Sequence, residues 1–373
     1  MSDNPIDLRS GATISAQELL ARAAASENRA WRGLHVAIAD FFLPDSARLD
    51  ERTRSSLDIL VREMVHSVEA EIREHGARLL SGKGESGLAR ALNGPGNLQI
   101  LSRLSQSDLL HDPELMAELL GRVRQEAVAA ALPMQAPDDP ERPSLINRFV
   151  QHPDRVLAAG AMAVLIAESR RRPSPEAGQP LRTDLPAELH HRLVWWVAAA
   201  LRERLEPSAG RQLALLDQCL TDAARRSLAT YDEHDRLEAA VMRFAAAIDA
   251  QPQELPQMLV EALGDRRVTL FIALLAHALG VDYVLGRELT LDPGGERLWL
   301  ALRALGLGRG PIARIGYALC EADPRRDVEI FADLLDAVVA TDAREARDGL
   351  GLLRLDPDYR AAVLALKRAK GSE

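Results

Sequence analysis

The sequence has few residues that favour β-strands. Aromatic residues make up only 4% of its 373 residues, although 47% are hydrophobic. Most of the apolar content is alanine and leucine, which favour helices, whereas strands are enriched in aromatic and β-branched residues. The composition therefore predicts an all-α protein without a sheet, built of antiparallel helix pairs that stack into a repeat-like array.

Cysteine, lysine and long apolar runs are also scarce. The two cysteines, Cys219 and Cys320, form no CxxC pair, so we expect buried thiols in a reducing compartment. The sequence has no stretch of about eighteen uncharged apolar residues, so no membrane span is expected. Residues 1–11 contain acids and no apolar segment, so no signal peptide is expected. These features predict a soluble, cytoplasmic protein.

The formal net charge is −9, and nearly all the basic residues are arginines. An acidic chain is a poor candidate for non-specific nucleic-acid binding, which needs a basic face. The alternative is that arginine clusters converge on one concave face. The clusters concerned are Arg170-Arg171-Arg172, Arg225-Arg226, Arg266-Arg267 and Arg325-Arg326.

Helix boundaries are indicated by two recurring patterns. Asp-Pro predicts helix starts, because aspartate caps free N–H groups and proline fits the first helical position. These pairs begin at Asp112, Asp292, Asp323 and Asp356, and the last three are spaced by about one helix pair, which suggests degenerate repeats. Leu-Gly predicts helix ends with a left-handed cap at Gly264, Gly280 and Gly306.

A proline-rich stretch at 133–143 is the predicted domain boundary. It separates an N-terminal helical block, residues 1–132, from a C-terminal helical-repeat block, residues 144–373. In the first block we expect helices near 15–26, 29–42, 50–80, 86–105 and 112–132. In the second we expect them near 144–151, 154–172, 186–205, 209–230, 234–250, 254–263, 267–279, 282–290, 294–305, 311–320, 325–340, 342–353 and 357–370.

No catalytic motif stands out, and we expect no cofactor. Glu63 and His66, and likewise Glu188 and His191, have the Glu-x-x-His spacing of di-iron helical bundles. Such a site needs two further inward-facing carboxylates, and His66 lies opposite the apolar stripe of its helix. A metal-dependent enzyme is therefore only a third hypothesis, and we predict no metal site.

The tripeptide His152-Pro153-Asp154 lies between two predicted helices, as the corresponding motif does in J-domain co-chaperones. The helix before it lacks the basic character that those proteins use. The simpler interpretation is that Asp154 caps the helix that begins at Arg155.

The most unusual segment surrounds two adjacent tryptophans. Leu193, Trp196 and Val197 share one apolar stripe, whereas Trp195 points roughly the opposite way. This helix is therefore either a central layer of the array or carries a partner-binding anchor made of Arg192, Trp195 and Trp196. Tryptophan and arginine are enriched at binding hot spots.

Three segments resemble a family of bacterial proteins known as domain of unknown function 2336. They are Ser169 to Leu205, Leu237 to Gly280 and Leu298 to Asp323. The resemblance implies a HEAT-like helical-repeat protein without an assigned reaction, and it supplies no catalytic residues.

These observations favour a non-enzymatic scaffold or regulator that binds a protein partner through a groove of the helical array. A second copy of the chain is another expected partner, which would give a homo-oligomer. Nucleic-acid binding by a HEAT-like protein is the alternative.

Overall fold

Segments rich in alanine and leucine form α-helices throughout the part of the chain that the structure describes. The computed structural model describes residues 48–94, 97–133, 143–171, 183–356, 358–360, 362–363 and 366. The first helices are α2 (Glu51–Gly82), α3 (Ser86–Asn93), α4 (Asn97–Gln106), α5 (Pro113–Ala131), α6 (Leu145–Val150), α7 (Arg155–Arg171), α8 (Ala187–Ala209) and α9 (Leu213–Thr230). They are followed by α10 (Leu237–Ile248), α11 (Leu255–Gly264), α12 (Val268–Leu279), α13 (Tyr283–Leu291), α14 (Glu296–Ala304), α15 (Arg309–Ala322), α16 (Val328–Ala340) and α17 (Ala343–Gly349).

The all-α prediction is confirmed, because no strand occurs among the described residues. The helix expected near 86–105 is two helices, since α3 ends at Asn93 and α4 begins at Asn97. The intervening Gly94-Pro95-Gly96 explains the break, because both residue types disfavour a helix interior. The helices expected near 15–26 and 29–42 lie outside the described residues.

The capping predictions hold at some positions and fail at others. Asp112 caps α5 by accepting a hydrogen bond from the Leu115 amide at 2.9 Å, with Pro113 in the first turn. The expected starts at Asp292 and Asp323 are wrong, because the next helices begin at Glu296 and Val328. In the second case Asp327 takes the capping role. An Asp-Pro pair can open a turn as well as a helix.

The same holds for the predicted helix ends. Gly280 and Gly306 have φ values of 69° and 83° and are left-handed as expected. Gly264 remains helical, and Arg266 takes the left-handed position with φ 58°. The Arg267 amide then donates to the Ala262 carbonyl at 2.8 Å, so the closing turn lies two residues further along than predicted.

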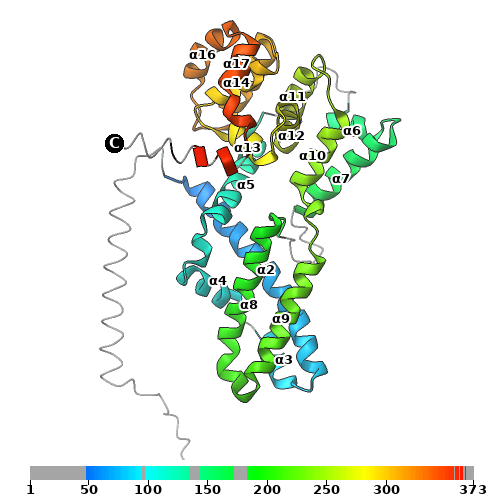
Figure 1. Ribbon diagram of the computed structural model, residues 1–373, viewed down its shortest axis with the longest axis vertical. Helices are drawn as coiled ribbons and strands as arrows, with labels where there is room; N and C mark the ends of the chain where they lie inside the picture. The colour runs from blue at the N-terminus through cyan, green and yellow to red at the C-terminus, as the bar shows by residue number, and fades with distance from the viewer. Residues whose placement is uncertain are drawn as a thin grey trace, which may run out of the picture. The chain divides into compact units, whose positions relative to one another are not determined.

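The described residues from Glu51 onwards form one compact unit, in which helices far apart in sequence pack together. Helix α2 packs against α3, α5, α8 and α9, and α10 packs against α7 and α12 (Figure 1). Helix α5 contacts α12, α13 and α15, which follow it by well over a hundred residues. The predicted HEAT-like stacking is not confirmed. Most of the proline-rich stretch 133–143 lies outside the described residues, so the two-block division stays a prediction.

The apolar core is centred on α12, most of which is buried. Its residues Phe271, Ile272 and Ala273 are each 0% exposed, and Phe244 of α10 is equally enclosed. No single described helix is long and apolar enough to cross a bilayer, although α12 and α13 pass that test as a pair bent by 114°.

Candidate functional site

Helix α5 carries three polar side chains on its buried side. Glu118, Arg122 and Gln125 are 7%, 5% and 2% exposed, and their spacing of four and three residues places them on one helical face. Buried charges are costly unless they are paired. The partners of these groups therefore define the polar centre of the molecule.

Glu118 is held by two arginines, one in α13 and one directly before α10. Arg287 of α13 donates to its Oε2 at 2.5 Å, and Arg236 donates to its Oε1 at 3.4 Å. Gly121 makes this approach possible, because a Cβ there would lie 2.9 Å from Nε of Arg287. The close contact between α5 and α13 thus depends on a glycine one turn from Glu118.

Arg171, the last residue of α7, joins two acids. Its Nε donates to Asp184 at 2.6 Å, and its Nη2 donates to both oxygens of Glu238 at 2.6 and 2.7 Å. Arg236 lies 3.6 Å from the same Glu238 carboxylate. We refer to Glu118, Arg171, Asp184, Arg236, Glu238 and Arg287 as the charge cluster.

The charge cluster sets the ionisation of its two central acids. Burial alone would raise the pKa of Glu238, but Arg171 and Arg236 lower it to about 2. Burial raises the pKa of Asp184, and the neighbouring Glu238 charge adds to this effect against the attraction of Arg171. Glu238 is therefore the anion that holds the two arginines in place.

Neutral polar side chains extend the polar centre towards the apolar core. Tyr283 of α13 donates to Oε1 of Gln125 at 2.9 Å, and the Gln125 amide donates to Thr269 of α12 at 3.1 Å. Burial raises the pKa of Tyr283 well above its ordinary value, so the hydroxyl stays protonated. These bonds fix α5 against α12 and α13.

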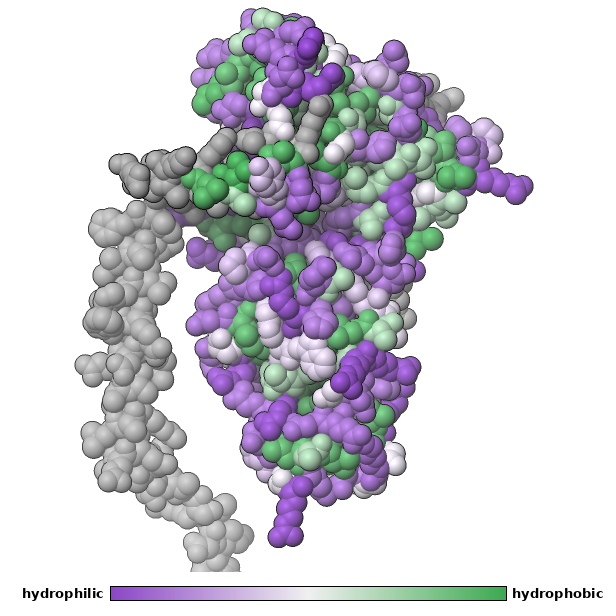
Figure 2. All heavy atoms as spheres, in the orientation of Figure 1, coloured by the Kyte–Doolittle hydropathy of each residue, from purple (hydrophilic) through white to green (hydrophobic). Residues whose placement is uncertain are grey.

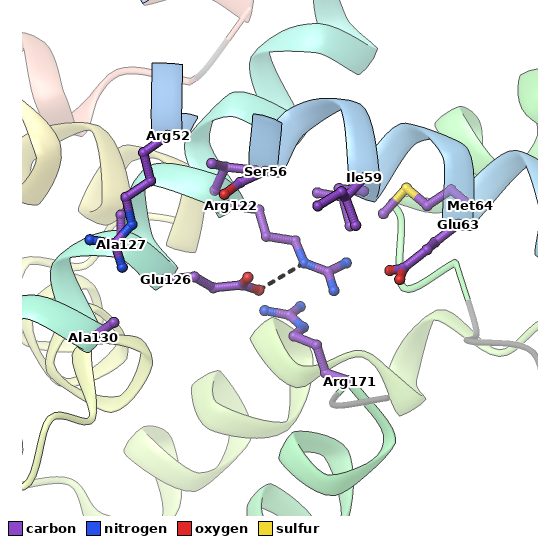
Figure 3. Close-up of a pocket in the computed structure, with 12 residues that line it drawn as sticks. Arg52, Ser56, Ile59, Glu63, Met64, Arg122, Glu126, Ala127, Ala130 and Arg171 are labelled. Atoms are coloured by element: carbon purple, nitrogen blue, oxygen red, sulfur yellow. Dashed lines mark hydrogen bonds and ion pairs between the residues drawn. The ribbon is translucent and has the colours of Figure 1, made fainter. Parts of the chain in front are cut away.

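Two clefts open on either side of Arg171. The first, of about 310 Å³, lies between α2 and α5, and Arg122 and Arg171 both point into it (Figure 3). Nε of Arg122 donates to Glu126 at 3.1 Å, whereas its buried Nη1 has no hydrogen-bond partner in the part of the chain that the structure describes. The first cleft is called the arginine cleft below.

The second cleft, of about 470 Å³, contains a buried histidine. His190 is 3% exposed, its Nδ1 lies 2.8 Å from Oγ1 of Thr183, and its ring stacks on Tyr231 at 3.9 Å. Its Nε2 has no hydrogen-bond partner within the described ranges, and burial together with the charge of His191 lowers the pKa of His190 to about 4. This cleft has more acids, Glu71, Glu74, Asp184, Asp232 and Asp235, than arginines, Arg170, Arg171 and Arg236.

Two of the three predicted partner-binding residues on α8 have polar partners within the chain. Arg192 donates to Asp112 at 2.6 Å and also pairs with Glu114, so it ties α8 to the start of α5. The indole of Trp195 donates to His191 of the same helix at 3.1 Å. Trp195 and Trp196 are both half-buried. Partner binding by this segment stays a prediction.

Most of the arginines considered for nucleic acid are engaged in internal contacts. Arg170 pairs with Asp235 at 2.9 Å, and Arg267 pairs with Glu168 at 2.6 Å. Arg325 pairs with Asp323 at 2.7 Å, whereas Arg326 is buried over the Trp299 ring at 5.3 Å. Arg225, Arg226 and Arg266 are exposed, as is the paired Arg170, and Arg172 lies outside the described residues.

The candidate metal residues do not form a cluster. Glu63 lines the arginine cleft, whereas His66, Glu188 and His191 are exposed on α2 and α8. Within the part of the chain that the structure describes, no three histidine, cysteine or acidic residues form a metal-binding group.

The interpretation of Asp154 as a helix cap is confirmed. Its Oδ1 accepts from the Val156 amide at 2.8 Å, and its own amide donates to Nδ1 of His152 at 3.2 Å. The motif therefore has a local structural role at the start of α7.

Sequence reasoning missed the charge cluster and the arginine cleft. Arg171 stands in a run of three arginines that is typical of an exposed basic patch, yet it is buried between two acids. One usable signal was present: Glu118, Arg122 and Gln125 interrupt the apolar stripe of α5 at helical spacing.

A family comparison covers most of this site. The sequence profile of a bacterial family described as "uncharacterised protein conserved in bacteria" (DUF2336) matches residues 104–348. The chain belongs to this family. The DUF2336 region runs from α4 into α17 and includes the whole charge cluster, whereas the α2 wall of the arginine cleft precedes it. No curated protein and no solved structure matches the chain.

Proposed function

We propose that this protein is a non-enzymatic, cytoplasmic regulator or scaffold that binds an acidic amphipathic helix of a partner protein on the outer face of α7. The observation that carries the proposal is the unusual exposure of this helix. Val156, Met162 and Ile166 are 67%, 44% and 47% exposed, although all are large and apolar. Large exposed apolar patches often mark interaction sites.

The exposed residues form one continuous stripe. Together with Ala159 they recur at three- and four-residue intervals over about three turns, or ~15 Å, which is the pattern that packs against another helix. The opposite face is already used: Ala161 and Val164 are fully buried, and α7 packs against α6 and α10. In the space-filling view, the surface formed by α7 carries apolar atoms beside hydrophilic ones (Figure 2).

The charges on this face select the partner. Arg155 and Arg170 lie on the exposed side of α7, where Arg170 also pairs with Asp235 at 2.9 Å. The single acid of the helix, Glu168, pairs with Arg267. The face is therefore apolar and basic on a chain whose net charge is −9. A helix with an apolar stripe and flanking acids complements it, because opposite charges steer association and fix register.

Photocrosslinking in the native bacterium tests the proposal. A benzoylphenylalanine at Ile166 should capture a partner that the same residue at Ile330, an equally exposed apolar position on α16, does not. A peptide of the partner's acidic helix should bind the purified chain, and Ile166→Asp should weaken binding at least tenfold without changing the unfolding midpoint. The matched control, Ile330→Asp, should bind normally.

Three outcomes would contradict the proposal. Crosslinks to a second copy of the chain would mean self-association instead of partner binding. Equal capture from both positions would mean that the α7 face is not specific. A DNA or RNA adduct at Ile166 would favour the nucleic-acid alternative.

A further inference from the structure

The arginine cleft contains a buried cation with donors to spare. Arg122 is only 5% exposed, and its acidic neighbour on α5, Glu126, accepts only from Nε at 3.1 Å. Nη1 is buried and has no hydrogen-bond partner among the described residues. A buried charged donor that lacks a partner costs free energy. Arg287 and Arg326 also have such an Nη1 within the part of the chain that the structure describes, but of the three arginines only Arg122 lines one of the two clefts.

A second guanidinium enters the same cleft from the other side. Arg171 reaches it from the end of α7, and Figure 3 shows the two guanidinium groups near one another in the middle of the residues that line the cleft. Asp184 and Glu238 engage Nε and Nη2 of Arg171, which fixes the orientation of the group. Two fixed guanidiniums that lie near each other can share an oxyanion, because each presents planar donors suited to carboxylate or phosphate oxygens.

The remaining walls indicate what else the ligand carries. One side of the cleft is apolar and is formed by Ile59, Leu60, Met64 and Val123. Ile59 is 55% exposed at the mouth of the cleft, and an apolar group there would cover it. The volume of about 310 Å³ suits a small molecule.

The acids of the cleft limit the charge of the ligand. Glu63 and Glu126 line it together with the three arginines Arg52, Arg122 and Arg171. Two negative charges so close disfavour a polyphosphate, whereas a ligand with one oxyanion group can lie against the arginines.

We infer that the arginine cleft binds a small amphiphilic oxyanion, with its carboxylate or phosphate between Arg122 and Arg171 and its apolar part against Ile59 and Leu60. This site is separate from the outer face of α7 and does not depend on partner binding there. It gives the protein a ligand-binding function that needs no catalytic residue.

Calorimetric titration of the full chain with hexyl phosphate, hexanoate and inorganic phosphate tests the inference. Saturable binding of either hexyl compound, at least tenfold tighter than that of inorganic phosphate, is expected. Tighter binding of hexyl phosphate would identify a phosphate ester, and tighter binding of hexanoate a carboxylic acid. No saturable binding of any of the three would overturn the inference.

Four variants locate the binding. Arg122→Met should weaken it at least tenfold, and Ala127→Trp should abolish it by filling the cleft while leaving both arginines in place. Glu126→Gln should strengthen it several-fold, because it removes a nearby negative charge. Arg309→Ala, an exposed arginine on α15, is the control and should leave binding unchanged.

Equal binding by all four variants would place the ligand elsewhere and overturn the inference. Loss of binding in Glu126→Gln would also contradict it, since that change leaves every cation of the cleft intact. Each variant's unfolding midpoint, measured alongside, shows that the folded chain is being tested.

Discussion

The apolar core around α12 and the charge cluster around Arg171 belong to the same compact unit but are stabilised by different interactions. Around α12, fully buried side chains such as Phe271 and Ile272 contact one another without charges. In the charge cluster, the side chains of Arg171, Glu238 and Arg236 are 7%, 7% and 11% exposed and hold each other through ion pairs. The core depends on shape and volume, whereas the cluster depends on matched charge.

This difference bears on function. Burying apolar side chains stabilises a fold directly. A buried ion-pair network must first offset the free-energy cost of removing its charges from water, and its net contribution is often close to zero. The charge cluster and the neighbouring Arg122 are therefore a costly way to join α5, α7, α10 and α13. The cost is understandable if the arrangement also holds Arg122 and Arg171 at the arginine cleft.

The largest effect is expected in the apolar core. Phe271→Ala should lower the free energy of unfolding by about 3–5 kcal/mol, because it leaves a cavity among fully buried neighbours. Urea unfolding at two salt concentrations and two pH values measures it. The loss should be the same under all four conditions, and a clear dependence on pH would show that the core and the charge cluster are not independent.

A change in the charge cluster should cost almost as much but respond to pH. Glu238→Gln should lower stability by about 3 kcal/mol at neutral pH, because Arg171 and Arg236 lose their shared anion. The folded pKa of Glu238, about 2, lies below its ordinary value of 4.5. The contribution is therefore present above about pH 4.5 and is lost as the pH falls towards 2.

Unfolding curves of wild type and Glu238→Gln at several pH values between neutral and acidic check this sign. The two curves should converge as the pH falls. A constant difference at every pH would mean that Glu238 acts through packing and not through its charge.

His190 should give a smaller pH effect at a higher pH. The pKa of His190 is about 4 in the folded chain and 6.5 ordinarily. Between these two values the histidine is protonated in the unfolded chain but neutral in the folded chain. Stability should fall by about 2 kcal/mol from this group between about pH 7.5 and pH 5. In His190→Gln this part of the slope should disappear, and an unchanged slope would place the titration on another residue.

The smallest effect is expected for an exposed ion pair. Arg103 and Glu203 lie 2.7 Å apart, but their side chains are 49% and 52% exposed. Water and salt screen such pairs, so Arg103→Ala should leave the urea midpoint unchanged within error. A loss comparable to that of Glu238→Gln would remove the contrast between buried and exposed charges.

The parts predicted from the sequence are those with local causes. The boundaries of α5, α7 and α12 follow from their own periodicity and caps, and the structure has them within one or two residues of the expected ranges. Most contacts of the charge cluster have no local cause, because they join segments that are far apart in the sequence. Arg171 and Glu238 pair across 67 positions, and only the tertiary fold brings them together.

The arginine cleft escaped prediction for the same reason. Arg52, Arg122 and Arg171 come from α2, α5 and α7, and no spacing rule connects them. The sequence also gives no sign that Arg192 pairs with Asp112 and Glu114 at the start of α5. In both cases the missing information is which helices are neighbours.

The central claim is that Arg122 is held in the arginine cleft for a ligand and not for the fold. The most direct test is the stability of Arg122→Met, measured by urea unfolding without ligand. Methionine fills similar space without the unpartnered Nη1, so the variant should be as stable as wild type or more stable. A loss of about 3 kcal/mol or more would show that Arg122 is a structural residue and would contradict the account.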